Sequence, residues 1–213
     1  MPEAIDLAAF DRTSERYEQF TDRARSLLTR DERFRAAHEA WIDHLEASHG
    51  GVFDRLPGED PESTLFVDLL YFDFVVSGLI DRIEEACEIS VTNAETRLED
   101  GRTLDSLHEQ VAESEAIEPV RPSEATLRTV GVDTLRTLYE RIVSREIRLA
   151  LGEYYTPRGV AALAVDSLDI EEIAAASLLD PGCGSGVFLS VCIQRKLVAM
   201  ADRGPAETVD AIE

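Results

Sequence analysis

Apolar residues recur at helical spacing through the first half of the chain, which predicts a helical module. The chain reads as helix from its amino terminus to about residue 30. In the next segment, residues 31–51, apolar side chains fall on one helical face. These residues are Phe34, Ala37, Trp41 and Leu45. Gly50 and Gly51 predict the end of this second helix, because glycine often terminates helices.

A third helix is predicted to begin at Asp60 and Pro61, since aspartate often caps a helix and proline suits its first position. Its apolar residues alternate at spacings of four and three, which predicts a buried stripe. They are Leu65, Leu69, Phe72, Val76, Leu79 and Ile83. A ligand could use the aromatic members, but core packing is the simpler interpretation. Asp68 and Asp73 interrupt the stretch, and we expect it to be too short to span a bilayer.

A boundary follows this helix. Residues 92–125 are polar with little periodicity, and Pro119 and Pro122 close the stretch. The next apolar pattern predicts one helix that begins at a capping residue, Asp133, and ends at Gly152. The residues expected to face inward are Leu135, Leu138, Ile142 and Leu149.

The last part of the chain has a different pattern. A short apolar run, "AASLLD", ends at Asp180 and is followed by the glycine-rich turn "PGCGSG" and the helical pattern "VFLSVCIQRKLVAM". We expect Phe188, Val191, Cys192 and Leu197 to face inward. Strand, glycine turn and helix in this order are typical of the first unit of an open α/β sheet, where ligands bind at the carboxyl ends of the strands.

The predicted fold class is a mainly α amino-terminal helical module followed by the first α/β unit of a truncated Rossmann-like domain. Accordingly, residues 1–121 are assigned to the helical module, 122–151 to an approach helix and 152–213 to the start of the α/β domain.

Charge restricts the possible partners. The 213 residues include 43 acidic and 21 basic residues, a formal net charge of −22, and Lys196 is the only lysine. Such an excess repels nucleic-acid phosphate at ordinary salt. Either the partner is not nucleic acid, or the protein works in a salt-rich cytosol, where about 1 M salt shortens the Debye length to about 3 Å. Carboxylates spread over all surface segments, with lysine nearly absent, resemble halophilic proteins, and we favour this second explanation.

One basic row stands out in this acidic chain. Arg141, Arg145 and Arg148 fall at spacings of four and three and would share one face of a continuous helix. Such a row could contact DNA phosphate. Because Glu140 and Glu146 are close enough to pair with it, a solvated ion-paired face is the alternative.

The cysteines and histidines show no metal-binding or disulfide pattern. The cysteines are Cys87, Cys183 and Cys192, and the histidines are His38, His44, His49 and His108. No histidine pair has the spacing of helical metal ligands, so we expect all four on the polar surface. The chain does not begin with a basic-then-apolar signal pattern, and we expect a cytoplasmic protein that does not contact a membrane.

The glycine turn favours one class of ligand. Glycines at alternating positions remove the Cβ atoms that would block a ligand from the backbone. The spacing G-x-G-x-G differs from the dinucleotide and phosphate-loop patterns. Asp180 adds a carboxylate, which disfavours pyrophosphate and suits a ligand with cationic groups. S-adenosylmethionine has an ammonium and a sulfonium but no phosphate, so we favour it; a purely structural turn is the alternative.

Three segments together resemble the adenine-specific (N-6) DNA methyltransferases of restriction-modification systems. They are "LYERI", "LGEYYTP" and "LLDPGCGSGVFL", in this order. The resemblance implies that the first motif group, Tyr154, Tyr155, Thr156 and Pro157, covers the methionine end of S-adenosylmethionine. It implies that the turn residues Asp180, Pro181, Gly182, Cys183, Gly184 and Gly186 form the floor of the cofactor site. We also expect Thr156 to cap the helix that Pro157 begins.

The same family places further features after this turn: an acidic residue at the end of a second strand, an Asn-Pro-Pro-Tyr or Asp-Pro-Pro-Tyr segment that holds a flipped adenine, and a target-recognition domain. None is found in this sequence, which has no Pro-Pro pair. We therefore expect the front part of a larger enzyme that does not methylate DNA alone. Its partners would be duplex DNA and possibly a second polypeptide that supplies the other half.

The helical module bears a weaker resemblance to the connectors of single-chain restriction-methylation enzymes, through "STLFVDLLYFDFVVSGLIDRI". Those enzymes carry a nuclease with a catalytic lysine ahead of the connector. Because Lys196 lies in the methyltransferase-like region, we expect no such nuclease here. The alternative function is a non-catalytic helical interaction module, or the remnant of a split or decayed gene.

Overall fold

The computed structural model describes residues 5–89, 104–113, 117–118, 120–168 and 177–199. The chain forms two compact units, residues 1–152 and residues 153–213. Unit 1 and unit 2 below denote these two parts.

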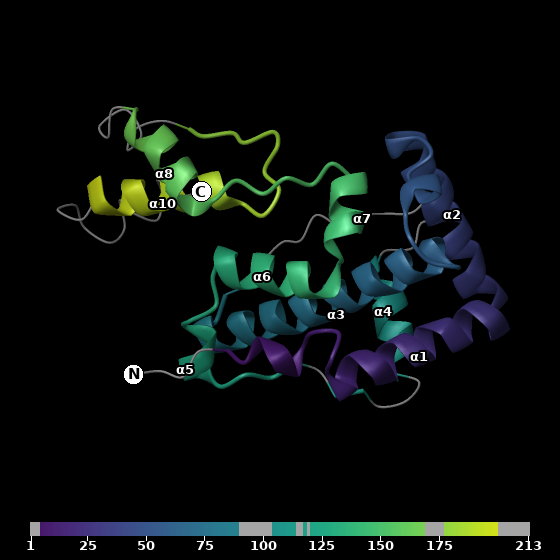
Figure 1. The fold of residues 1–213 in the computed structure, drawn as a ribbon. Coiled ribbons are helices and arrows are strands. Elements are labelled where there is room, and N and C mark those ends of the chain that lie inside the picture. Colours follow the sequence, from purple (N-terminus) through teal and green to yellow (C-terminus); the bar gives the residue numbers. More distant parts are fainter. Residues whose placement is uncertain (1–4, 90–103, 114–116, 119, 169–176, 200–213) are drawn as a thin grey trace. The chain divides into compact units, whose positions relative to one another are not determined.

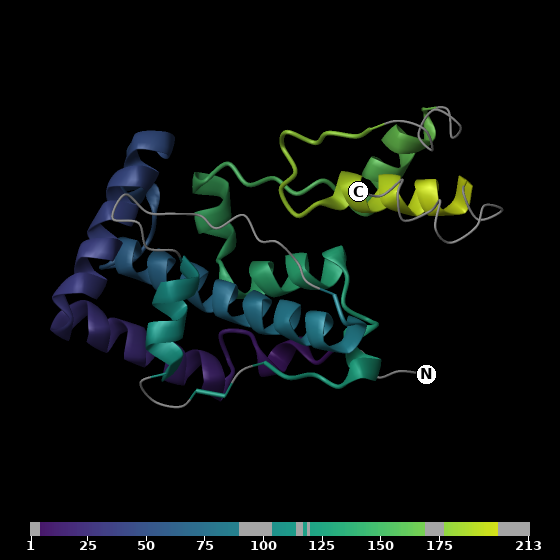
Figure 2. The same ribbon diagram turned by 180° about the vertical axis from the view of Figure 1, so that it is seen from behind.

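Unit 1 consists of helices packed around one central helix. In chain order they are the 3-10 helix η1 (Leu7–Ala9), α1 (Glu15–Arg30), α2 (Glu32–His49), the 3-10 helix η2 (Phe53–Arg55), α3 (Pro61–Cys87), α4 (Leu104–Glu113), α5 (Glu124–Leu127), α6 (Val132–Ile142) and α7 (Arg145–Ala150). Helices α1, α2, α4, α5 and α6 all pack against α3, which runs through the middle of the unit (Figure 1; Figure 2).

The helix starts in unit 1 follow capping chemistry. Asp31 caps α2, its Oδ1 accepting from the backbone N–H groups of Arg33 and Phe34. Asp60 caps α3 by accepting from the N–H of Ser63 at 3.1 Å, and proline occupies the first position of that helix. The predicted start of α3 and the predicted end of α2 at Gly50, which has a φ of +45°, are therefore confirmed.

Helix α3 is buried on more than one face, so the predicted single stripe is too narrow. Of the six predicted stripe residues, Leu65 and Leu79 are fully buried, whereas the other four are half-buried. The remaining buried side chains of α3 are Phe66, Val67, Asp68, Leu70, Tyr71, Phe74 and Val75. A helix that is apolar all round lies inside a protein rather than along its surface. Packing by five neighbours explains the width of the buried face of α3.

The length of α3 also differs from the sequence expectation. Its 27 residues are long enough and apolar enough to cross a membrane by length and composition alone. More than half of the residues in its most apolar stretch are buried inside unit 1. The core helix of a bundle has the same composition, so this finding is weak evidence for a membrane span.

Aromatic rings fill the contacts between α3 and its neighbours. Phe20 on α1 stacks on Phe74 at a centroid distance of 5.2 Å. On the other side, Trp41 on α2 lies 5.4 Å from Phe66. Aromatic pairs at such distances add about 0.5–1.5 kcal/mol beyond area burial. These contacts hold α1 and α2 onto the central helix.

Two histidines lie in this core, which corrects the expectation that all four are on the surface. His38 on α2 is buried, with its ring 4.8 Å from that of Phe66. His108 on α4 is buried and its Nδ1 lies 2.8 Å from Oδ2 of Asp73. His44 and His49 are exposed as expected. A carboxylate partner or an aromatic neighbour makes burial possible, and neither is apparent from local sequence spacing.

The predicted approach helix is broken into α6 and α7. Val143 adopts an extended conformation, with φ −96° and ψ 122°, and the Oγ of Ser144 caps α7 by accepting from the N–H of Ile147. Leu138 and Ile142 are buried as predicted, but Leu149 is 39% exposed because it lies beyond the break. Serine competes for backbone hydrogen bonds inside a helix, which favours a new start at Ser144.

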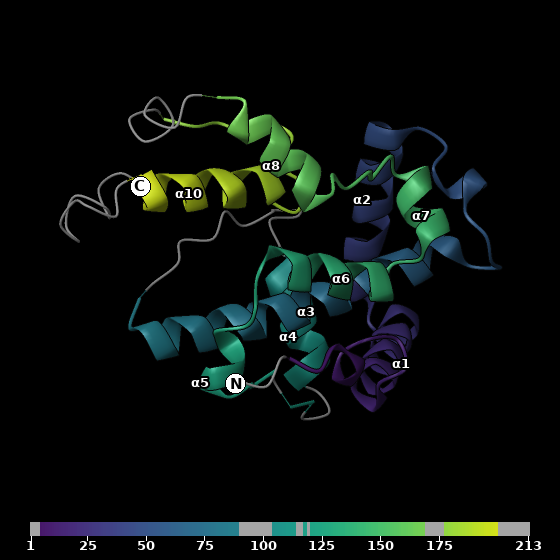
Figure 3. The same ribbon diagram turned by 60° about the vertical axis from the view of Figure 1, so that its left-hand side comes forward.

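Unit 2 contains two described helices, α8 (Arg158–Asp166) and α10 (Val187–Ala199), which pack side by side (Figure 3). Ala161 and Val165 of α8 and Val187, Val191 and Cys192 of α10 are buried. The predicted helix after the glycine turn is confirmed, although Leu197 is 42% exposed rather than inward.

The predicted α/β unit is wrong for the part of the chain that the structure describes, which contains helices and no strand. Of the expected strand "AASLLD", the first two residues lie outside the described part, and residues 177–180 have irregular backbone. Leu178 is 38% and Leu179 is 89% exposed. A strand needs a neighbour to satisfy its backbone N–H and C=O groups, and no described segment offers one. The described fold is mainly α.

Candidate functional site

Two arginines join α8 to α10. Arg158, the first residue of α8, donates to Oγ of Ser190 in the first turn of α10 at 3.1 Å and to Oε1 of Gln194 near the middle of α10 at 2.8 Å. At the other end of α8, Arg195 donates to both carboxylate oxygens of Asp166, at 2.6 and 2.9 Å. The pKa of Asp166 is lowered, mainly by the hydrogen bond from Arg195. Both helices are thus fixed to each other at two points.

The Tyr-Tyr-Thr-Pro segment leads directly into α8. Tyr154 is 77% exposed, whereas Tyr155 and Thr156 are half-buried. The N-cap of α8 is Pro157, whose carbonyl accepts from the N–H groups of Val160 and Ala161 at 2.9 and 3.1 Å. Thr156 therefore does not cap the helix, contrary to expectation, because it lies one residue before the cap. The segment is placed by the start of α8 rather than by a threonine cap.

The glycine turn leads directly into α10. Gly184 and Gly186 have φ values of +52° and +76°, which side chains rarely adopt. The N–H of Gly186 donates to the carbonyl of Cys183 at 2.8 Å, and its own carbonyl accepts the first hydrogen bond of α10, from Ser190. By contrast, Gly182 has an ordinary φ and its Cβ position faces open space. Its backbone is therefore accessible to a ligand.

The structure brings the two motif segments together. A Cβ atom at Gly184 would lie 3.9 Å from Cε1 of the Tyr155 ring, an ordinary van der Waals contact. Both segments precede the helices α8 and α10, whose starts Arg158 joins. Of the remaining motif residues, Pro181, Gly182 and Cys183 are exposed on the same turn. Two segments about two dozen residues apart thus form one surface.

Two buried polar atoms in the turn have no hydrogen-bond partner. Oδ1 of Asp180 accepts from the N–H of Gly182 at 3.1 Å, but Oδ2 of the same carboxylate is buried and unpaired. Oγ of Ser185 is also buried and unpaired. A buried polar atom without a partner costs about 1–3 kcal/mol, and more when it is charged. A ligand that donates hydrogen bonds would satisfy both.

The charge of Asp180 affects the pKa of a cysteine on α10. Burial raises the pKa of the Cys192 thiol, and the Asp180 carboxylate raises it further. Cys192 therefore stays a neutral thiol inside the unit. Cys183, on the turn itself, is exposed.

An apolar hollow lies on the inner side of the turn. Its volume is about 370 Å³, and its lining is mostly apolar. The lining residues are Ala164, Val165, Leu168, Leu178, Leu179, Asp180, Phe188, Leu189 and Cys192. Asp180 is the one motif residue among them. The hollow and the Tyr155–Gly184 surface therefore meet at Asp180.

The arginines proposed for DNA phosphate lie in unit 1, on two helices rather than one. Arg141 lies in the last turn of α6, 3.3 Å from Oδ2 of Asp11, while Arg148 on α7 lies 3.5 Å from Oε1 of Glu140. Arg145 is exposed at the start of α7, next to Glu146, whose pKa its charge helps to lower. Because the helix break separates Arg141 from the other two, the single row expected from spacing does not form.

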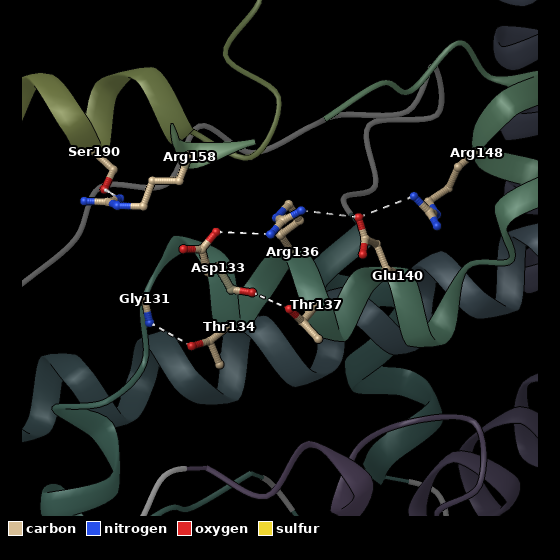
Figure 4. Close-up of polar contacts among 9 residues, drawn as sticks. All are labelled: Gly131, Asp133, Thr134, Arg136, Thr137, Glu140, Arg148, Arg158 and Ser190. Carbon is tan, nitrogen blue, oxygen red and sulfur yellow. Dashed lines mark hydrogen bonds and ion pairs between the residues drawn. The ribbon is translucent and has the colours of Figure 1, made fainter. Parts of the chain in front are cut away.

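Ion pairs continue along α6. Arg136 lies 3.2 Å from Asp133 and 3.7 Å from Glu140, and Glu140 also pairs with Arg148 (Figure 4). Asp133 is therefore a member of this chain of charges and not the cap of α6. The N-cap is Gly131, whose N–H donates to Oγ1 of Thr134 at 3.2 Å.

Sequence reasoning missed Arg158 and Ser185. Arg158 follows directly after the Tyr-Thr-Pro segment, but its partners Ser190 and Gln194 are more than thirty residues away. Ser185 lies between two glycines of the turn, and its type alone carries no sign that its hydroxyl is buried. A polar residue held between two positive-φ glycines is the one available signal.

Residues 131–207 match the family model of the N-6 DNA Methylases. The match covers α6, α7, α8 and α10 and contains both motif segments, so the resemblance stated from the motifs is confirmed for this part of the chain. No curated protein and no solved structure matches the chain significantly.

Proposed function

We propose that this chain, which matches the N-6 DNA Methylase family model over residues 131–207, supplies the S-adenosylmethionine-binding part of a DNA adenine methyltransferase of a restriction-modification system. The observation that carries this proposal is that the Tyr155 ring lies close to Gly184 of the glycine turn, and that Oδ2 of Asp180, at the start of the same turn, is buried and unpaired. The methyl group would go to the exocyclic amine of adenine.

The residues present fit this cofactor. The unpaired carboxylate oxygen of Asp180 would accept a hydrogen bond from a cationic or hydroxyl donor, and the Oγ of Ser185 would pair with a second polar group. The open Cβ position at Gly182 leaves room for a ligand against the backbone. S-adenosylmethionine carries an ammonium, two ribose hydroxyls and no phosphate, which suits a carboxylate-bearing turn.

The bound cofactor would supply an activated methyl group on its sulfonium. The residues of this chain would bind and orient it: Asp180 by charge, the glycine turn by its exposed backbone and the Tyr155 ring by covering one side. Orientation of reacting groups is a large source of rate enhancement. The role proposed for unit 2 is therefore cofactor binding.

The groups that hold the adenine are proposed to lie outside these 213 residues, because the sequence has no Pro-Pro pair and so no Asn-Pro-Pro-Tyr segment. A second polypeptide that carries this segment is the proposed partner, together with duplex DNA. Apolar side chains on unit 2 support such a partner, since Leu163 is 74%, Leu179 is 89% and Val198 is 61% exposed.

The acidity of the chain bears on the salt concentration at which it would bind DNA. A net charge of −22 opposes DNA binding at ordinary ionic strength. In molar salt the Debye length is about 3 Å, so exposed charges farther apart than this are largely screened from one another. We propose that the protein works in such a cytosol, where short-range contacts decide binding.

Calorimetric titration of the full chain with S-adenosylmethionine in molar KCl tests the function. We expect saturable binding to one site, with loss of at least tenfold in affinity for Asp180→Asn, which removes the charge while keeping an acceptor for Gly182. Asp166→Asn is the matched control, because this carboxylate is already paired with Arg195 and has no unpaired oxygen like Oδ2 of Asp180. Binding that is unchanged in Asp180→Asn would overturn the assigned site.

A non-catalytic interaction module is the second candidate. The exposed leucines of unit 2 favour it, since an apolar surface can serve association without chemistry. Absence of S-adenosylmethionine binding by the wild-type chain, with a defined complex at high salt, would support this candidate over the first.

A further inference from the structure

We infer that Arg158 is a positioning residue that holds the Tyr-Thr-Pro segment and the glycine turn in register for cofactor binding; the inference rests on the proposed function. Arg158 is the first residue of α8, directly after Pro157. Its partner Ser190 lies in the first turn of α10, which begins directly after Gly186, and its partner Gln194 lies near the middle of that helix. Arg158 therefore connects the place where the Tyr-Thr-Pro segment enters α8 to the helix that follows the glycine turn.

The two motif segments are not joined to each other by regular secondary structure. Residues 153–157 and 177–183 have no helix or strand, so no backbone ladder sets the distance between them. Cε1 of Tyr155 lies 3.9 Å from the position that a Cβ atom at Gly184 would take, so the segments lie close together. Hydrogen bonds from a guanidinium are directional and stronger than bonds between neutral groups. Arg158 supplies such a bond from the start of α8, which follows the first segment, to Ser190 in the first turn of α10, which follows the second (Figure 4).

The chain provides a natural comparison for this role. Arg195 joins the same two helices by two hydrogen bonds to Asp166, at the opposite end of α8. With nine residues in α8, Asp166 lies about 12 Å along the helix axis from Arg158. If Arg158 only stabilised the helix pair, removing either arginine would have the same consequence. If Arg158 positions the site, the two consequences differ.

The test compares Arg158→Ala with Arg195→Ala in the full chain, by calorimetric titration with S-adenosylmethionine. We expect Arg158→Ala to weaken binding at least tenfold and Arg195→Ala to change it less than twofold, although both lower the melting temperature. Gln194→Ala should weaken binding about threefold in the wild-type background and have no further effect in Arg158→Ala, because it acts through the arginine. Equal losses in Arg158→Ala and Arg195→Ala, or an undiminished Gln194→Ala effect, would overturn the inference.

Amide hydrogen exchange without cofactor separates this inference from the proposed function. The Gly186 N–H, bonded to the Cys183 carbonyl, reports the integrity of the turn. We expect its exchange to accelerate at least fivefold in Arg158→Ala and to stay within twofold in Arg195→Ala. Unchanged exchange in Arg158→Ala contradicts positioning even if the wild-type chain binds no S-adenosylmethionine. Failure of wild-type binding with accelerated exchange contradicts the proposed function and leaves the positioning role supported.

Discussion

The phenol of Tyr17 on α1 donates to Oδ1 of Asp68, a fully buried carboxylate in the first third of α3, at 2.6 Å. Arg12 pairs with the other oxygen, Oδ2. Burial raises the pKa of Asp68, and the hydrogen bond from Tyr17 and the charge of Arg12 oppose this rise. Burial and the nearby carboxylate also raise the pKa of Tyr17, which keeps it a donor. The amino-terminal segment is thereby attached to the central helix.

Tyr17→Phe should lower the free energy of unfolding by about 1.5–3 kcal/mol, because it removes a hydrogen bond to a buried charged group. Urea unfolding at fixed high salt measures the change. Tyr154→Phe, at a largely exposed position, serves as the control and should stay within about 0.5 kcal/mol of wild type. A Tyr17→Phe variant as stable as wild type would contradict the importance of this bond.

Arg12→Ala should destabilise unit 1 by about 1–3 kcal/mol. Removing one partner of a fully buried ion pair costs about 3–5 kcal/mol, and the smaller value reflects the partial exposure of Arg12. Adding Asp68→Asn to Arg12→Ala should recover part of the loss, since no unpaired charge then remains buried. A double-mutant cycle measured by urea unfolding gives the coupling, and strict additivity would contradict a direct interaction.

Stability should fall with acidification through the titration of His38. Burial lowers the pKa of this histidine below its ordinary value of 6.5, although a hydrogen bond with the Glu62 backbone opposes the shift. Between the folded and unfolded values the unfolded chain binds more protons, so the contribution is present above pH 6.5 and is lost as the pH falls through and below it. Urea midpoints from pH 5 to 8 should show a smaller pH dependence in His38→Gln than in wild type.

The helix break predicts losses of stability of different size for two similar substitutions. Ile142→Ala should cost about 2–4 kcal/mol, because this side chain is fully buried at the end of α6. Leu149→Ala should cost less than about 1 kcal/mol, since Leu149 is 39% exposed on α7. Chemical unfolding of the two variants compares them directly. Equal losses would indicate one continuous helix with both residues inward.

Two substitutions in the glycine turn separate conformation from ligand access. Gly186→Ala should destabilise unit 2 by about 1–2 kcal/mol because of its positive φ. Gly182→Ala should leave stability unchanged, since its φ is ordinary and its Cβ faces open space, yet weaken S-adenosylmethionine binding. Thermal unfolding and calorimetric titration of both variants provide the two readouts. Full binding by Gly182→Ala would place the cofactor elsewhere.

Local chemistry predicted several helix boundaries in unit 1 and the helix that follows the glycine turn. The cap at Asp60, the stop at Gly50 and the helix after Gly186 follow from rules that act within a few residues. The two motif segments were recognisable from the order of their residues alone, and the family match includes both. Positive φ at Gly184 and Gly186 agrees with the glycine spacing of the turn.

The features that the sequence did not predict depend on contacts with residues distant in sequence. His38 and His108 are both buried against side chains of α3. The ring of His38 lies next to that of Phe66, and Nδ1 of His108 is within hydrogen-bonding distance of the Asp73 carboxylate. Arg158 acquires its role from residues on another helix. The predicted strand needs neighbouring strands, which no described segment supplies, so its apolar pattern alone could not produce a sheet.

The attachment of Asp11 to Arg141 has a consequence for the order of folding during synthesis. These two residues are 130 positions apart, yet both belong to unit 1. A chain made from its amino terminus therefore completes unit 1 only after α6 has left the ribosome. Such distant contacts slow folding, because a long loop must close first. The segment that contains Tyr155 and Gly184 is made next, so on a growing chain the helical unit is assembled before the proposed cofactor site.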